Sequence, residues 1–118
     1  MVLNAETVKG ISVVSLPERL NSTNCPAFKQ FLDPLMADNA LFVFDMTQLN
    51  YMDSSALGTM VGCIKHLREI GGDLKLFGMT KRVRALFEMV RMHHIFEIFD
   101  TREEALDSFS NGSAKVQE

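Results

Sequence analysis

The sequence has few of the residues that mark several large classes of protein. Only two of its 118 residues are cysteines, Cys25 and Cys63, and neither lies in a CxxC or Cys/His ligand spacing, so two reduced, partly buried thiols are expected. The longest nearly apolar stretch, Ala56–Ile64, is far shorter than the roughly 20 residues of a membrane-spanning helix. The N-terminus lacks a basic leader followed by an apolar segment. We therefore expect a cytoplasmic protein without direct membrane insertion.

Basic residues are too few for a typical nucleic-acid-binding protein. The chain has 12 basic and 15 acidic residues, a net charge of −3, whereas phosphate binding usually shows as a basic excess. Residues 81–94 are locally basic, and a solvated helix face explains them; attraction of an acidic partner protein is the alternative. Nucleic acid is therefore not expected as a partner.

Hydrophobic residues, in contrast, are plentiful. They make up 47% of the chain, which is enough for one sizeable core. We expect a single domain over residues 1–110. The small polar residues of the last segment, 111–118, are typical of a disordered tail.

Two short strands, Val2–Val8 and Ile11–Leu16, are predicted to form an N-terminal hairpin around a turn at Lys9–Gly10. Three further strands are predicted over residues 40–46, 73–79 and 95–100. Four helices alternate with them. The first has a cap at Ser22, Thr23 or Asn24, Pro26 in its first turn and Pro34, which should distort or shorten it, and the second stops at Gly71–Gly72. Thr80 caps the third helix, and a Thr101-x-x-Glu104 capping box precedes the last, which runs to about Phe109. The order ββαβαβαβα predicts an α/β fold with a small, mixed, mostly parallel sheet.

The stretch "NYMDSSALG", residues 50–58, separates an apolar strand from an apolar helix. Asp53 is well placed to cap the helix, and that structural role alone explains an acidic residue there. It does not explain the two serines that follow. A hydroxyl at the first helical position, at the carboxyl end of a strand, projects from the edge of the sheet, where open α/β sheets place their working groups. Ser54 can therefore accept a phosphoryl group from a kinase.

An enzyme is not expected. Neither serine lies in the G-x-S-x-G pattern of a hydrolase elbow, and His66 is about three turns further along the same helix. His93 and His94 are adjacent, so they point in different directions and make a poor metal site; a solvated helix end is the simpler interpretation. Gly58-x-x-x-Gly62 is interpreted as close packing of its helix on the sheet or on a neighbouring helix. No catalytic residue, metal or cofactor is predicted.

The segment from "FVFDM" to "EEAL" resembles the anti-sigma factor antagonist family, the STAS domain, and the likeness covers about residues 1–110. It is strongest at Asp53-Ser54-Ser55-x-Leu57-Gly58 and is supported by Gly71-Gly72 and by "VRALFEMVRMHHIFEIF". The resemblance implies a small mixed sheet with helices packed mainly on one face. It also implies a partner-switching regulator of transcription, whose unphosphorylated form binds an anti-sigma factor that is also a serine kinase.

The same resemblance implies the site. The phosphoacceptor is the serine directly after the Asp, hence Ser54, with Ser55 as the alternative. Phosphorylation releases the complex, and a serine phosphatase resets it. The implied partner-binding residues are Asp53, Ser54, Ser55, Met52, Leu20 and Asn21, the last two from the loop that follows the second strand. Two other functions stay open: a STAS-type accessory or scaffold subunit of a transporter or signalling assembly without a phosphorylation cycle, and a small enzyme or ligand-binding protein.

Overall fold

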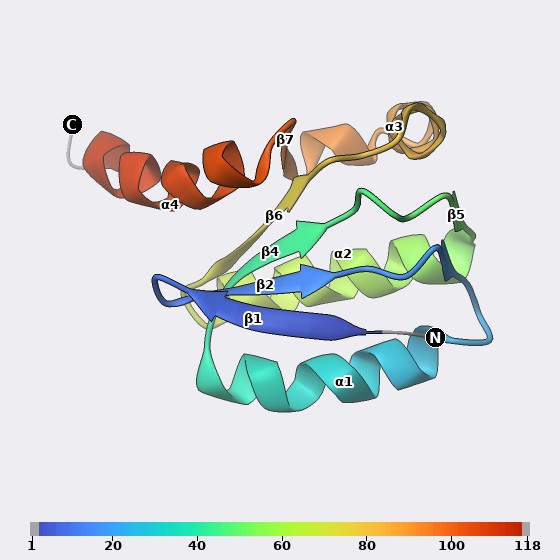
Figure 1. Cartoon of the computed structure of the whole chain (residues 1–118), viewed down its shortest axis with the longest axis horizontal. Helices are drawn as coiled ribbons and strands as arrows, with labels where there is room; N and C mark the ends of the chain where they lie inside the picture. Colours follow the sequence, from blue (N-terminus) through green and yellow to red (C-terminus); the bar gives the residue numbers. More distant parts are fainter. Residues whose placement is uncertain (1–2, 117–118) are drawn as a thin grey trace.

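A five-stranded sheet forms the centre of the protein (Figure 1). The computed structural model describes residues 3–116, with side chains described for residues 3–110. The strand order is β1-β2-β4-β6-β7, and the strands are β1 (Asn4–Val8), β2 (Ile11–Ser15), β4 (Leu41–Asp45), β6 (Asp73–Phe77) and β7 (Glu97–Phe99). β1 runs antiparallel to β2, and every other neighbouring pair is parallel. The predicted mixed, mostly parallel α/β sheet is therefore confirmed.

The predicted N-terminal hairpin is present, with its turn at Lys9 and Gly10. Both residues have positive φ, 53° and 81°, as a two-residue turn of the right twist requires. The strands are shorter than predicted, because β1 begins at Asn4 and β2 ends at Ser15. Val2, the predicted first strand residue, lies outside the described residues.

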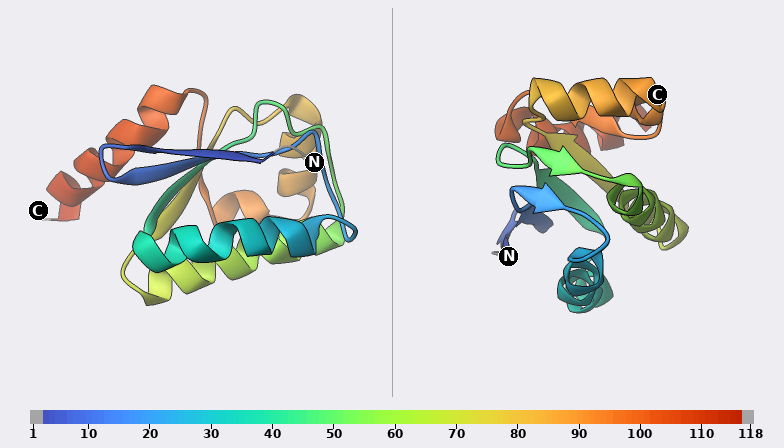
Figure 2. Two further views of the ribbon diagram at one scale, coloured as in Figure 1. Left: turned by 60° about the horizontal axis from the view of Figure 1, so that its bottom comes forward. Right: turned by 90° about the vertical axis from the view of Figure 1, so that its right-hand side faces the viewer.

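In the described part of the chain, helices cover both faces of the sheet unequally. They are α1 (Cys25–Asp38), α2 (Ser54–Glu69), α3 (Lys81–Met89) and α4 (Arg102–Val116), with a short 3-10 turn η1 (Met92–His94). The larger core cluster joins α1, α2 and α3 to one face, and Phe28 of α1 packs edge-on against Phe44 of β4 with ring centroids 5.7 Å apart. A smaller cluster joins α4 to the opposite face through Ala105. Figure 2 shows α1 and α2 on one side of the sheet and α4 on the other.

Most predicted helix boundaries are confirmed. Thr80 caps α3, and Thr101 and Glu104 exchange the two hydrogen bonds of a capping box, each of 3.2 Å. Gly71, with φ of 88°, follows the end of α2. Gly72 lies against the backbone of Ala40 with no space for a Cβ atom.

Three expectations about the helices need correction. α1 continues past Pro34 to Asp38, so this proline does not shorten the helix. α4 continues to Val116 rather than ending near Phe109; residues 117–118, the end of the predicted tail, lie outside the described residues. The expected close packing at Gly58 and Gly62 is wrong, because a Cβ atom added at either glycine meets nothing within 4 Å.

One element was not predicted at all. The loops after β2 and β4 pair with each other as a two-stranded parallel ladder, β3 (Arg19–Leu20) with β5 (Tyr51–Met52). The Asn50 N–H extends it by donating to the Glu18 carbonyl oxygen at 2.8 Å. This ladder fixes the two loops that carry the predicted site residues.

Candidate functional site

The candidate site lies where β5 ends and α2 begins, at the end of the molecule that faces the viewer in the right-hand panel of Figure 2. β4 ends at Asp45, and residues 46–50 lead to β5. Asp53 follows β5 directly, and Ser54 is the first residue of α2. The loop from Pro17 to Asn24 lies beside this junction because β3 pairs with β5.

Asp53 connects the two loops and caps the helix. One carboxylate oxygen, Oδ1, accepts from the Ala56 N–H at 3.1 Å, which is the predicted cap. The other, Oδ2, accepts from the Ser22 N–H at 3.0 Å in the neighbouring loop. The Asp53 N–H donates in turn to the Leu20 carbonyl oxygen at 3.3 Å. The side chain and the backbone of one residue therefore set the position of the start of α2 relative to the other loop.

These hydrogen bonds also set the protonation of Asp53. Desolvation acts to raise the pKa of this carboxyl, but the backbone N–H groups of Ala56, Ser22 and Ser55 favour the charged form and hold the pKa below its ordinary value. Asp53 is therefore a carboxylate at neutral pH, with its oxygens engaged by backbone donors.

Both serines after the cap are exposed. The hydroxyl of Ser54 makes no hydrogen bond to another residue within the described part of the chain, so no internal contact has to break before it reacts. Ser55 lies one residue further into the helix, and its carbonyl oxygen accepts from the Thr59 hydroxyl at 2.9 Å. The N–H groups and the dipole at a helix N-terminus favour a negative charge near Ser54.

The structure brings the other predicted partner-binding residues to the same junction, but two of them are not on the surface. Leu20 is fully buried and Met52 is 6% exposed, because both side chains of this ladder pair point into the core. Their role here is to hold the backbone of the site. Asn21 is half-buried, and its Oδ1 accepts from the Thr23 N–H at 3.0 Å, so it shapes the loop.

No arrangement of histidine, cysteine and carboxylate side chains in the described residues is suited to a metal ion. Cys25 and Cys63 are free and buried, and burial raises the pKa of Cys63 to about 11. In the same part of the chain, no helix is both long enough and apolar enough to cross a membrane.

Two features of this region were missed by the sequence analysis. A groove of about 470 Å³ runs between α1 and α2 beside Gly58 and Gly62, and no neighbour fills the space that the missing side chains of these glycines leave. Its signal in the sequence is the presence of two glycines four residues apart in one helix. The second feature is a contact between Arg19 and Tyr51, with the guanidinium carbon 4.5 Å from the ring centroid. It depends on the unpredicted β3–β5 ladder, so the sequence carries no local signal for it.

Sequence comparison relates this chain to known proteins. The sequence profile of the STAS domain matches residues 2–105. A curated relative, the anti-sigma-B factor antagonist of Listeria monocytogenes, is 34% identical over 80 residues, which cover 67% of this chain and 70% of that protein.

Two solved structures share the fold. An anti-sigma factor antagonist from Mycobacterium paratuberculosis superimposes with a TM-score of 0.82 at 20% identity, covering 91% of this chain and 92% of that one. The phosphorylated form of the Bacillus cell fate determinant SpoIIAA superimposes with a TM-score of 0.71 at 19% identity, covering 92% of this chain and 99% of that one. At these identities the structures establish a common fold.

Proposed function

Because this chain belongs to the STAS domain family, and its curated relatives are anti-sigma factor antagonists, we propose that it is a partner-switching anti-sigma factor antagonist with Ser54 as its phosphoacceptor. The unphosphorylated protein binds an anti-sigma factor that is also a serine kinase, in the cytoplasm. Phosphorylation of Ser54 dissociates the complex, and a serine phosphatase restores the binding form. The chain is a regulator in this cycle and catalyses no reaction itself.

The observation that carries this proposal is the state of the Ser54 hydroxyl. It is exposed, makes no internal hydrogen bond within the described residues, and stands on the first residue of a helix whose start is fixed by Asp53. A kinase can therefore reach this oxygen without unfolding any part of the protein. Ser55, the alternative, is exposed as well, but it is the second residue of α2 rather than the first.

The physical basis of the switch is a change of charge that the protein tolerates and its partner does not. A phosphoryl group adds about −1.5 to −2 charges at pH 7. The N-terminus of α2 favours this charge, so the fold is retained. A partner surface fitted to a neutral hydroxyl has to desolvate and oppose a dianion beside the Asp53 carboxylate, which costs several kcal/mol. At about 1.4 kcal/mol per tenfold change, this dissociates a complex of ordinary affinity.

A capture experiment with lysate of the source cell tests the proposal. Ser54→Ala, Ser54→Asp and Ser55→Ala baits are compared, and retained proteins are identified by mass spectrometry. We expect Ser54→Ala and Ser55→Ala to retain an anti-sigma factor with a kinase domain, and Ser54→Asp to lose it. Retention of the same proteins by Ser54→Asp contradicts the proposal, and recovery of a membrane transporter instead favours the accessory-subunit function.

A further inference from the structure

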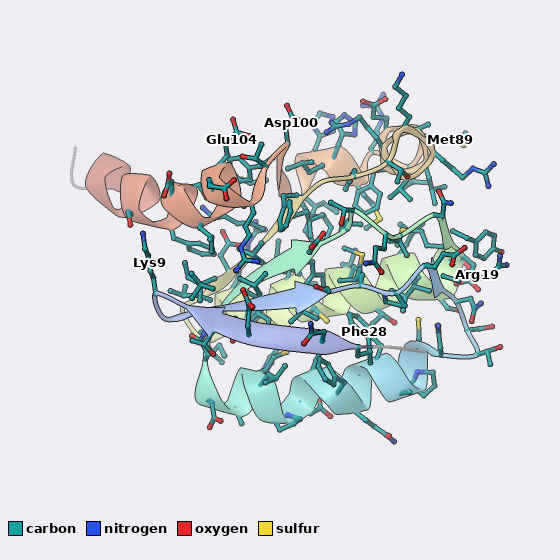
Figure 3. The ribbon with its side chains drawn as sticks, viewed as in Figure 1. Lys9, Arg19, Phe28, Met89, Asp100 and Glu104 are labelled. Carbon is teal, nitrogen blue, oxygen red and sulfur yellow. The ribbon has the colours of Figure 1, made fainter. Side chains whose placement is uncertain are left out.

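The β3–β5 ladder presents one aromatic and one cationic side chain on its outer side. Arg19 and Tyr51 are directly opposite each other in the ladder, and their neighbours Leu20 and Met52 point into the core. The side chains of adjacent ladder residues alternate, so Arg19 and Tyr51 face solvent. Tyr51 is 39% exposed, and the guanidinium carbon of Arg19 lies 4.5 Å from its ring centroid. Figure 3 shows Arg19 at the right-hand end of the molecule, opposite the end that carries Lys9.

We propose that Arg19 and Tyr51 together form an anchor for the anti-sigma factor, in which the Arg19 guanidinium binds a carboxylate of that partner beside the Tyr51 ring. The proposal rests on the proposed function and adds to it. It names two contact residues and the chemistry of the partner surface that meets them.

The first support for this anchor is the unused binding capacity of Arg19. The described residues form four ion pairs between side chains, and Arg19 takes part in none of them. In the described part of the chain, the Arg19 guanidinium lies beside the Tyr51 ring and donates no hydrogen bond to another residue, so the N–H groups along its edge are available to a partner. This edge matches a carboxylate with two parallel hydrogen bonds. Arginine and tyrosine are also the residue types, with tryptophan, that contribute most to protein interfaces.

The second support is that the pair is already held in place. The Tyr51 N–H donates to the Glu18 carbonyl oxygen at 3.3 Å, and the Asn24 side-chain amide donates to the Arg19 carbonyl oxygen at 2.8 Å. The stack itself restricts the long arginine side chain. A partner therefore meets an ordered surface, and little conformational entropy is lost on binding.

The third support is position. Tyr51 is three residues before Ser54, so the two Cα atoms are at most about 10 Å apart at roughly 3.3 Å per residue. A standard interface covers about 800 Å² on each partner, which is roughly 30 Å across. A partner that senses the Ser54 hydroxyl at the centre of such an area also covers Tyr51 and Arg19.

A purely internal role for the stack makes a different prediction. If the stack only closes the two loops, its loss lowers stability and leaves the affinity of the folded protein unchanged. Binding and unfolding are therefore measured on the same variants.

The experiment uses the purified anti-sigma factor identified by the Ser54→Ala bait, and measures its affinity by calorimetry and its association rate by surface-bound kinetics. We expect Arg19→Ala and Tyr51→Ala to weaken binding about tenfold each, and Arg19→Glu about 100-fold, because the reversed charge repels the partner's carboxylate. Tyr51→Phe keeps the ring and stays within about threefold of wild type. Lys9→Asp makes the same change of charge as Arg19→Glu at the far end of the molecule, and binds like wild type.

The outcomes separate the two proposals. If Ser54→Asp abolishes binding but Arg19→Glu binds like Lys9→Asp, the anchor is refuted and the switch stands. Refutation also follows if Arg19→Ala and Tyr51→Ala lower only the unfolding temperature. If no anti-sigma factor binds in a manner that depends on residue 54, the proposed function fails and the anchor fails with it.

Discussion

Two helices of this protein begin near the same edge of the sheet with similar caps and opposite chemistry after the cap. α2 starts behind Asp53, whose carboxylate accepts from the Ala56 N–H, and α3 starts behind Thr80, whose hydroxyl accepts from the Val83 N–H. The first two residues of α2 are the exposed hydroxyls Ser54 and Ser55. The first two residues of α3 are cations, Lys81 and Arg82, also exposed.

A capped helix N-terminus is therefore not sufficient for a phosphorylation switch. Positive charge at the start of α3 opposes the helix dipole, and no hydroxyl is presented there. The start of α2 carries the hydroxyl and also has the loop of residues 17–24 bound to its cap through the Ser22 N–H. We infer that the second loop, with the Arg19–Tyr51 pair, is what makes this helix start recognisable to a partner.

The largest expected effect comes from moving the hydroxyl from one helix start to the other. Ser54→Ala is expected to lose all phosphorylation by the cognate kinase, and Lys81→Ser in the same chain is not expected to restore it, because the start of α3 lacks the neighbouring loop. Band shifts on phosphate-affinity gels report the result. Ser55→Ala is the control and is expected to retain phosphorylation. Phosphorylation of the double variant Ser54→Ala/Lys81→Ser would mean that the kinase recognises a helix start without the neighbouring loop.

The caps themselves are expected to differ in their contribution to stability. Thr80→Ala removes the acceptor of the Val83 N–H and the 3.4 Å hydrogen bond that the Thr80 hydroxyl donates to the Leu49 carbonyl oxygen, and lowers the free energy of unfolding by about 1 kcal/mol. Asp53→Ala removes a charged acceptor for the Ala56 N–H of α2 and for the Ser22 N–H of the neighbouring loop, so its effect is expected to be larger than that of Thr80→Ala. Urea denaturation at pH 7 measures both. Equal losses would mean that the charge of Asp53 and its link to the neighbouring loop add nothing to stability beyond what the neutral Thr80 cap supplies.

The sequence predicts these caps because their signals are local. The helix N–H groups that are capped by Asp53, Thr80 and Thr101 each lie three residues after the capping residue, and the Lys9–Gly10 turn is equally local. The phosphoacceptor candidate follows from the same short segment.

The β3–β5 ladder, unlike the caps, has no local signal in the sequence. Each of its strands has two residues, and paired residues such as Arg19 and Tyr51 are 32 positions apart. No periodicity exists over two residues, and the pairing is stabilised by the tertiary fold. The burial of Leu20 and Met52, and the exposure of Tyr51, follow from that ladder and were therefore beyond reach of the sequence.

The cap of α2 is also expected to respond to pH, unlike the cap of α3. The folded-state pKa of Asp53 lies below its unfolded value, so the stabilisation is fully present above the unfolded pKa of about 4 and is lost as the pH falls through the folded pKa. The stability difference between wild type and Asp53→Asn should therefore shrink below about pH 4. Urea denaturation from pH 7 to pH 3 measures it. Thr80→Ala, which removes no titrating group, should show a constant difference over the same range.

The smallest expected effect concerns the interior of the two helices. α2 contains Gly58 and Gly62, whereas α3 contains no glycine. Glycine in a helix interior is less favourable than alanine by about 0.5–1 kcal/mol, and an added Cβ atom at either position meets nothing within 4 Å. Gly62→Ala should therefore raise the free energy of unfolding by about this amount, without altering phosphorylation of Ser54.

Gly72→Ala provides the matched control, because its Cβ atom would collide with the backbone of Ala40 and lower stability. Loss of stability in Gly62→Ala would show that the groove between α1 and α2 closes in solution. A gain in stability accompanied by weaker binding of the anti-sigma factor would show instead that the open groove belongs to the binding surface. The two helices would then differ in partner binding along their whole length and not only at their first residues.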